Sequence, residues 1–112
     1  MTVSYFVFYQ GTAEDRDDFV EYYRTTHAAI LETFPGLLDL RIHQGMNWKD
    51  GQNIADGGFL LVAEMVFPDK KTLQAAIVSP ERTVAREDFG NFSTFHGKIL
   101  HQAMATIHHS NS

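Results

Sequence analysis

The chain has 112 residues, with 9 lysine and arginine residues against 14 aspartate and glutamate residues, so its formal net charge is −5. It contains no cysteine, which excludes disulfides, cysteine-ligated zinc and a thiol nucleophile. The length favours one domain spanning 1–112, and the acidic balance argues against nucleic acid or an anionic membrane as a partner. No apolar run is long enough to cross a membrane, and residues 1–5 lack the basic start of a secretory signal. We therefore expect a single-domain cytoplasmic protein.

The first half of the chain predicts a strand, a long helix and a second strand. Residues 2–10 are β-branched and aromatic on both faces, which is typical of a central strand covered on both sides. From about 14 to 34 the apolar residues recur at helical spacing, after a capping signal at Thr12 or Asp15, and a Pro-Gly pair ends the helix. Residues 37–44 alternate between apolar and polar side chains, which indicates a strand near an edge or beside a wet cavity.

The second half predicts the same kinds of element after a long loop. Residues 45–58 are polar and rich in glycine, and residues 59–67 form another strand with two apolar faces. A helix is expected from 70 to about 78, and a short helix or turn over 81–89. The alternation over 97–108 predicts the last strand.

The order β-α-β-β-α-β predicts an α+β, ferredoxin-like fold with a four-stranded antiparallel sheet. The strands at 2–10 and 59–67 should lie side by side in its centre, and the two helical crossovers lead us to expect that these two strands are parallel to each other. Two helices cover only one face of a sheet, whereas both central strands are apolar on both faces. We therefore expect a homodimer in which a second copy covers the open face.

His27 is the main candidate for chemistry. It lies in the apolar stripe of the first helix, one turn after Tyr23. Imidazole is suited to general acid or base chemistry because its pKa of about 6.5 lies near neutral pH. A core histidine bonded to a backbone carbonyl fits the same pattern, and the spacing alone leaves both interpretations open.

Residues 19–37, FVEYYRTTHAAILETFPGL, resemble the signature of the EthD family, in which a helix carries Phe, Tyr and His ahead of a Pro-Gly-Leu turn. The resemblance to the second half of that family rests on Ser79, Asp88 and Phe89 or Phe92. EthD proteins belong to the dimeric α+β barrel superfamily, with methylmuconolactone isomerase, polyketide cyclases and antibiotic-biosynthesis monooxygenases. The resemblance implies a homodimer, and a cleft between sheet and helices where His27 is the acid or base acting on a small hydrophobic substrate.

Further candidates for binding a substrate are Tyr23, Arg41, His43 and Trp48. Tyr23 and the histidine one turn later could share a polar ligand. Arg41 and His43 share the polar face of the second strand, which is either a solvated edge or part of the cavity lining, with Arg41 binding a carboxylate or enolate. Trp48, in the long loop, is either an anchor that packs on the body or part of a lid over the ligand.

No metal site and no cofactor are expected. The six histidines show neither an H-x-x-x-H nor an H-E-x-x-H spacing, and Asp88 is interpreted as the cap of a helix or turn. Two hypotheses for the function remain. One is a cofactor-independent isomerase, cyclase or lyase that acts on a small aromatic or lactone-like compound, with His27 moving the proton. The other is a non-catalytic accessory or small-molecule-binding protein of a catabolic or oxygenase pathway.

Overall fold

The computed structural model describes residues 1–46 and 58–110. The elements are β1 (Val3–Ala13), α1 (Arg16–Tyr22), the π-helix η1 (Tyr23–His27), α2 (Ala28–Leu31), β2 (Asp39–Gln44), β3 (Phe59–Phe67), α3 (Lys70–Ile77), α4 (Pro80–Asp88), the short 3₁₀-helix η2 (Phe89–Asn91) and β4 (Phe95–Ala105). The strands form one antiparallel sheet in the order β2-β3-β1-β4. The predicted α+β, ferredoxin-like fold with a four-stranded antiparallel sheet is therefore confirmed.

The two central strands run in opposite directions, so the expectation that they are parallel is wrong. β1 and β3 are neighbours, but Val3 pairs with Phe67 and Val7 pairs with Ala63. The crossover helix makes β1 parallel to β2, and the chain then reverses between β2 and β3, which pair antiparallel. This one reversal sets β3 against β1.

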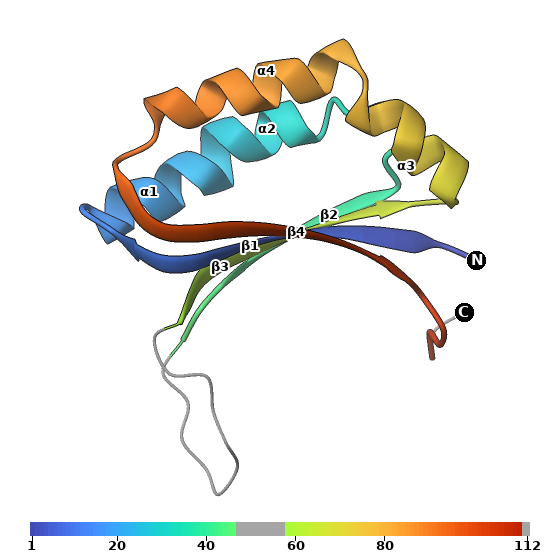
Figure 1. Ribbon diagram of the computed structural model, residues 1–112, viewed down its shortest axis with the longest axis horizontal. Coiled ribbons are helices and arrows are strands. Elements are labelled where there is room, and N and C mark those ends of the chain that lie inside the picture. Colours follow the sequence, from blue (N-terminus) through green and yellow to red (C-terminus); the bar gives the residue numbers. More distant parts are fainter. Residues whose placement is uncertain (47–57, 111–112) are drawn as a thin grey trace, which may run out of the picture.

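All the helices of the described residues cover one face of the sheet, and none of them lies on the other face (Figure 1). Because side chains alternate across a strand, Val7 and Tyr9 of β1 face the helices while Phe6 and Phe8 face away. Their partners across the register, such as Ala63 beside Val7, divide in the same way. The sheet thus has a covered face, which holds the core, and an open face.

The first helical segment is one rod built from three parts rather than a continuous α-helix over 14–34 (Figure 1). Of the two possible caps, Asp15 is the one used, because its carboxylate accepts a hydrogen bond from the Asp18 backbone N–H at 3.0 Å. The π-helix η1 then widens the rod for one turn, from Tyr23 to His27. Such π turns occur frequently at functional sites, and here the two residues at its ends are both buried.

The helices of the second half begin at side-chain caps. The Asp69 carboxylate accepts from the Thr72 backbone N–H at 2.8 Å and starts α3. The Ser79 hydroxyl accepts from the Arg82 backbone N–H at 3.3 Å and starts α4, with Pro80 as its first residue. The segment expected to be a short helix or turn is therefore a regular nine-residue helix.

β1 continues past Gly11, where the sequence was expected to end the strand, because Gly11 pairs with Gly97 of β4. Both glycines have positive φ angles, 150° and 149°. A Cβ on Gly11 would lie 2.1 Å from the backbone oxygen of His96, and one on Gly97 would lie 2.1 Å from that of Gln10. These two glycines, which face each other across β1 and β4, thus let the strands approach closely. β4 also begins two residues earlier than expected.

The core is rich in aromatic side chains and lies between the covered face and the helices. Its largest fully buried members are Tyr23, Phe19, Phe67, Leu61 and Met65. The Tyr9 ring packs edge-on against those of Phe19 and Tyr23, at centroid distances of 5.6 and 5.3 Å. No helix among the described residues is long and apolar enough to span a membrane.

Candidate functional site

A cavity of about 250 Å³ lies between the covered face of the sheet and the helices. Its apolar lining comprises Val7, Leu31, Phe34, Met65, Ile77, Ala85, Phe89 and Ile99. Its polar lining comprises Tyr5, Tyr9, Tyr23, His27, Arg82, Arg86 and His101. A largely apolar wall with a few polar groups is typical of small-molecule sites. Since a cavity of about 150 Å³ accommodates benzene, this one has room for one or two rings.

His27 and Asp88 form a buried pair beside this cavity. The imidazole Nδ1–H donates to the Asp88 carboxylate at 2.9 Å, and the exposed fractions of the two side chains are 6% and 8%. The pair joins the end of η1 to the end of α4 across 61 residues of sequence. The aspartate thereby fixes which imidazole nitrogen carries the proton.

The surroundings favour a neutral imidazole beside an ionised carboxylate. Burial lowers the pKa of His27 below its usual value, although the hydrogen bond and the charge of Asp88 act in the opposite direction. Burial alone would raise the pKa of Asp88, but hydrogen bonds from Tyr22, His27 and Asn91 outweigh it and lower that pKa. At neutral pH the histidine is therefore a free base.

The second imidazole nitrogen of His27 is Nε2. It forms no hydrogen bond with any described residue, yet no buried side-chain nitrogen or oxygen in the described part of the chain is without a partner. Nε2 is therefore accessible, and His27 lines the cavity. A neutral histidine with Nδ1–H on a carboxylate and Nε2 open to a cavity has the geometry of a general base.

Asp88 is held by side chains rather than acting as a backbone cap, which corrects the interpretation made from the sequence. The Tyr22 hydroxyl donates to its Oδ1 at 2.6 Å, and the Asn91 amide donates to the same oxygen at 3.1 Å. No backbone N–H at the start of η2 is capped by the carboxylate. These two donors orient the aspartate toward His27.

The tyrosines of the cavity wall remain protonated. Tyr9 donates to the Tyr23 hydroxyl oxygen across 3.4 Å. Burial raises the pKa of Tyr9 to about 12 and raises that of Tyr23 well above its usual value. The Tyr23 ring also packs against His27 at a centroid distance of 4.8 Å. The structure thus brings together two of the residues predicted for the site, Tyr23 and His27.

Arg41 and His43 lie on the open face, away from this cavity. Arg41 pairs with Glu64, and His43 pairs with Val62, in the register of β2 and β3. Side chains alternate along a strand, and the neighbours of these residues face the helices. Arg41 and His43 therefore face away from the helices. The Arg41 guanidinium binds Asp39 at 3.2 Å, and His43 Nε2 is 3.9 Å from the Glu64 carboxylate. The structure does not bring either residue to His27 within one subunit.

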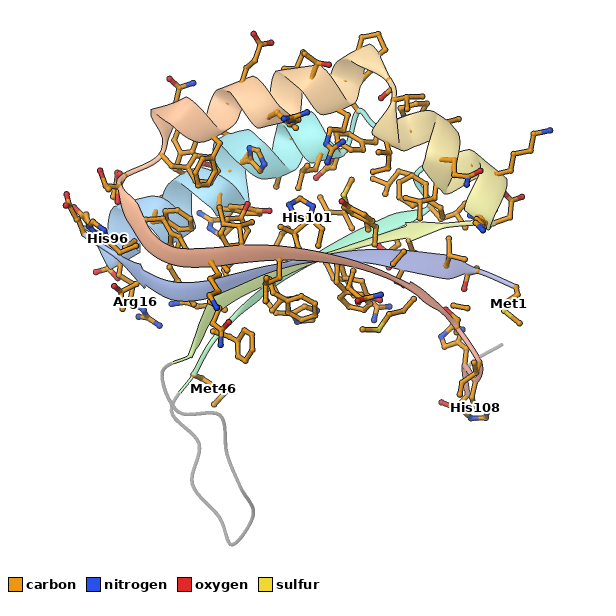
Figure 2. The ribbon with its side chains drawn as sticks, viewed as in Figure 1. Met1, Arg16, Met46, His96, His101 and His108 are labelled. Atoms are coloured by element: carbon orange, nitrogen blue, oxygen red, sulfur yellow. The ribbon has the colours of Figure 1, made fainter. Side chains whose placement is uncertain are left out.

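Trp48 and most of the loop at 45–58 lie outside the described residues, so the anchor and the lid remain alternatives. Within the described ranges, no group of three or more His, Asp or Glu side chains could hold a metal ion. The histidines are spread along the molecule: His101 projects from β4 toward the helices, whereas His96 and His108 lie at opposite ends (Figure 2).

Three features of the site were missed in the sequence: the role of Asp88 and the two arginines of α4, Arg82 and Arg86. Asp88 had one signal, its place in the part of the chain that resembles the second half of the EthD family. The arginines had a weaker signal. They are four residues apart on a helical segment, which puts them on one face, but only the packing of α4 shows that this face lines the cavity.

The fold and the cavity define a ferredoxin-like α+β protein with a histidine–aspartate pair between its sheet and its helices. Comparison with known families gives a more specific assignment, because the EthD domain model matches residues 12–96. The chain belongs to the EthD family.

Solved structures agree with this assignment. An ethyl tert-butyl ether D (EthD) family protein from Bacillus halodurans C-125 has 25% identity and a TM-score of 0.76, covering 96% of this chain and 100% of that one. An EthD-like protein from Ralstonia eutropha JMP134 has 14% identity and a TM-score of 0.74, covering 99% and 97%. SnoaB, a cofactor-independent oxygenase from Streptomyces nogalater, has 14% identity and a TM-score of 0.63, covering 96% and 95%. No curated protein matches the sequence.

Proposed function

We propose that this protein binds a small aromatic or lactone-like molecule in the cavity and transfers a proton through His27, without a cofactor, as an isomerase, cyclase or lyase does. One observation carries the proposal. His27 Nδ1 is bonded to Asp88 at 2.9 Å, while the other nitrogen of the ring is accessible and the residue lines the cavity. An accessible ring nitrogen on a residue that lines the cavity is available to a ligand, whereas that of a histidine enclosed in the core is not.

The step begins at a carbon acid next to a carbonyl group of the ligand. The C–H bond breaks, its proton moves to Nε2 of His27, and its electron pair passes into the carbonyl system as an enolate. Asp88 stabilises the imidazolium that results, as the aspartate of a Ser-His-Asp triad does. The proton then returns from Nε2 to another carbon in an isomerisation, or to a leaving group in an elimination. No atom or electron is lost in either course.

Tyr23 is suited to bind the enolate oxygen. It accepts a hydrogen bond from Tyr9, and its own O–H has no acceptor among the described residues. Its raised pKa keeps this proton in place at neutral pH. A donor held at the point where negative charge develops is a principal source of catalysis. Tyr23 would therefore bind the oxygen while His27 holds the proton.

The comparison with SnoaB supports the absence of a cofactor. That protein is described as a cofactor-independent oxygenase and shares the fold of this chain. A shared fold does not determine the reaction, but it is consistent with chemistry that relies on side chains and substrate alone. The proposal for this chain rests on its own histidine–aspartate pair.

A β,γ-unsaturated γ-lactone such as α-angelica lactone tests the proposal. Its conversion to the conjugated isomer requires removal of one proton and its return two carbons away, and ultraviolet absorbance follows the product. We expect turnover by the wild-type protein and a decrease of about 10²–10⁴-fold in His27→Gln, which is the usual contribution of a general base. Deuterium from D₂O should enter the product in the wild-type reaction.

The matched control is His96→Gln. His96 is an exposed histidine that also binds a carboxylate, that of Glu14 at 3.1 Å, so this variant removes the same group outside the cavity. It should retain full activity. A lactone that binds and shifts the NMR signals of His27 without proton exchange would contradict catalysis and favour the binding protein. Equal activity in His27→Gln and the wild type would contradict the role of His27.

We also propose that two copies pair through the open face of the sheet. This face carries Phe6, Phe8, Val62, Val66, Leu100 and Met104, and Leu100 and Met104 are 44% and 48% exposed in the single chain. Apolar surface of this kind is typical of an interface. Two structures with the same fold are described as dimeric ferredoxin-like proteins, one from Thermobifida fusca YX and one from Jannaschia sp. CCS1.

A further inference from the structure

Two arginines also line the cavity. Arg82 and Arg86 lie one turn apart on α4, and both belong to the cavity wall. Asp88 is on the same helix, and six residues separate it from Arg82, which places them about 9 Å apart along the helix axis. Along α4, Arg82 therefore lies at one end and the pair of His27 and Asp88 at the other, with Arg86 between them; His27 and both arginines line the cavity.

The charges of these arginines are not neutralised by the protein. Neither Arg82 nor Arg86 forms an ion pair with any residue that the structure describes. Among the described residues, the Arg82 guanidinium donates one hydrogen bond, to the Ile77 carbonyl oxygen at 3.3 Å. Arg82 is half-buried and Arg86 is exposed. In a chain with a net charge of −5, two uncompensated cations at one cavity make a local positive field that attracts an anion.

A third donor lines the same cavity. The Tyr5 hydroxyl is 2.6 Å from Nδ1 of His101. Burial lowers the pKa of His101, and the charges of Arg82 and Arg86 lower it further, so this ring is neutral at pH 7. Burial raises the pKa of Tyr5, so its hydroxyl keeps the proton and donates it to Nδ1. Nε2 of His101 then carries the ring proton and has no acceptor among the described residues.

We propose that Arg82, Arg86 and His101 form an anion subsite, and that the ligand of this cavity is a one- or two-ring acid whose carboxylate binds there. Guanidinium groups match a carboxylate in geometry and in charge. With the carboxylate held at this end, the rings fill the apolar middle of the cavity and their far side faces His27. This inference names the class of ligand for the proposed function. Only the reaction of that ligand at His27 rests on the proposed function, because binding of the anion is measured separately.

The pair of probes 1-naphthoate and 1-naphthamide tests the subsite by isothermal titration calorimetry at pH 7.5 and low salt. The two molecules have nearly the same shape, but only the first carries a charge. We expect naphthoate to bind the wild-type protein at least about tenfold more tightly than naphthamide. The double variant Arg82→Gln/Arg86→Gln should lose this preference while its affinity for naphthamide is unchanged.

Arg24→Gln is the matched control. It removes the same charge from an exposed arginine, whose side chain is 64% exposed and pairs with Glu21. It should keep the tenfold preference. Because Arg82 also bonds the end of α3, Arg86→Gln alone provides a variant that retains this contact, and it should lose part of the preference. Circular dichroism verifies that each variant is folded.

Two results would overturn the subsite. The wild-type protein could bind both probes equally, or Arg24→Gln could lower naphthoate binding as much as the double variant does. In the first case naphthamide still binds in the cavity, so the proposed function survives and only the anion subsite fails. If neither probe bound at millimolar concentration, the subsite would also be overturned. The role of His27 is tested separately, by turnover of the lactone.

Discussion

The substitution Asp88→Asn tests whether the carboxylate determines where the proton on His27 resides. Tyr22 and Asn91 both donate to Oδ1 of Asp88, whereas His27 donates to Oδ2. Asparagine has nearly the same shape, but one of its two terminal atoms is a donor. Its oxygen can keep the bonds from Tyr22 and Asn91, and its NH₂ group then faces Nδ1 of the histidine.

Two donors cannot face each other in a buried site, so the imidazole must change tautomer. Nδ1 becomes the acceptor, and Nε2, the nitrogen open to the cavity, takes the proton. A protonated Nε2 on a neutral ring is no longer a base, so proton-transfer activity should decrease by up to about 10⁴-fold, as it does when a triad aspartate becomes asparagine. The exchange of one charge-assisted bond for a neutral one should cost only about 1–2 kcal/mol of stability.

Long-range ¹H–¹⁵N NMR of the histidine side chains measures the tautomer directly, and thermal denaturation measures the stability. For a domain of this size the melting temperature should decrease by about 3–10 °C. The control is Asp15→Asn, because asparagine caps a helix as well as aspartate does, and it should change neither quantity. If Asp88→Asn kept an unprotonated Nε2 and full activity, the carboxylate would have no role in directing the proton.

Three further predictions concern stability and assembly. Because the pKa of His27 is lowered in the folded protein, the unfolded chain takes up the proton first as the pH falls below about 6.5. The melting temperature should therefore decrease below that pH, and it should decrease less steeply in His27→Gln. An equal pH dependence of the melting temperature in both proteins would contradict the role of His27 in it. Gly97→Ala should destabilise the protein by about 1–3 kcal/mol in urea denaturation, because Gly97 has a positive φ and a backbone oxygen lies close to where its Cβ would be. Gly90→Ala should be neutral, because a Cβ at that position meets nothing within 4 Å. Equal effects of the two substitutions would refute the importance of Gly97. Sedimentation equilibrium at micromolar concentration should give twice the 12.7 kDa of one chain, and Leu100→Lys on the open face should shift it toward the monomer; a stable wild-type monomer would exclude the dimer.

Most of the fold could be predicted because its signals are local. Apolar residues at strand and helix spacing, the capping aspartates and the Pro-Gly turn each act over a few residues, and their order fixes the topology. The direction of β3 relative to β1 was predicted wrongly, because the prediction considered the two helical crossovers and not the reversal of the chain between β2 and β3. The continuation of β1 beyond Gly11 was missed because a glycine that ends a strand and one that permits close approach look the same until its partner, Gly97, is known.

The candidate site was only half predictable. His27 stands out because a titratable group within an apolar stripe requires a partner, and that signal is contained in one helix. Asp88 is 61 residues away and no spacing rule connects the two. Arg41 and His43 show a second limit of prediction from the sequence. Alternation established that they share a face of their strand, but which face meets the helices depends on how the whole sheet packs.

The position of Asp88 supports the proposed role of the pair in proton transfer. It is the last residue of α4, and a carboxylate at the C-terminal end of a helix lies against the negative end of the helix dipole. It is also buried, where a charge is costly unless several donors offset the lost water. Tyr22, His27 and Asn91 supply those donors, whereas an apolar side chain would need none of them. An ionised carboxylate at this position would stabilise a proton that arrives on His27 from the cavity, which is the role proposed for it.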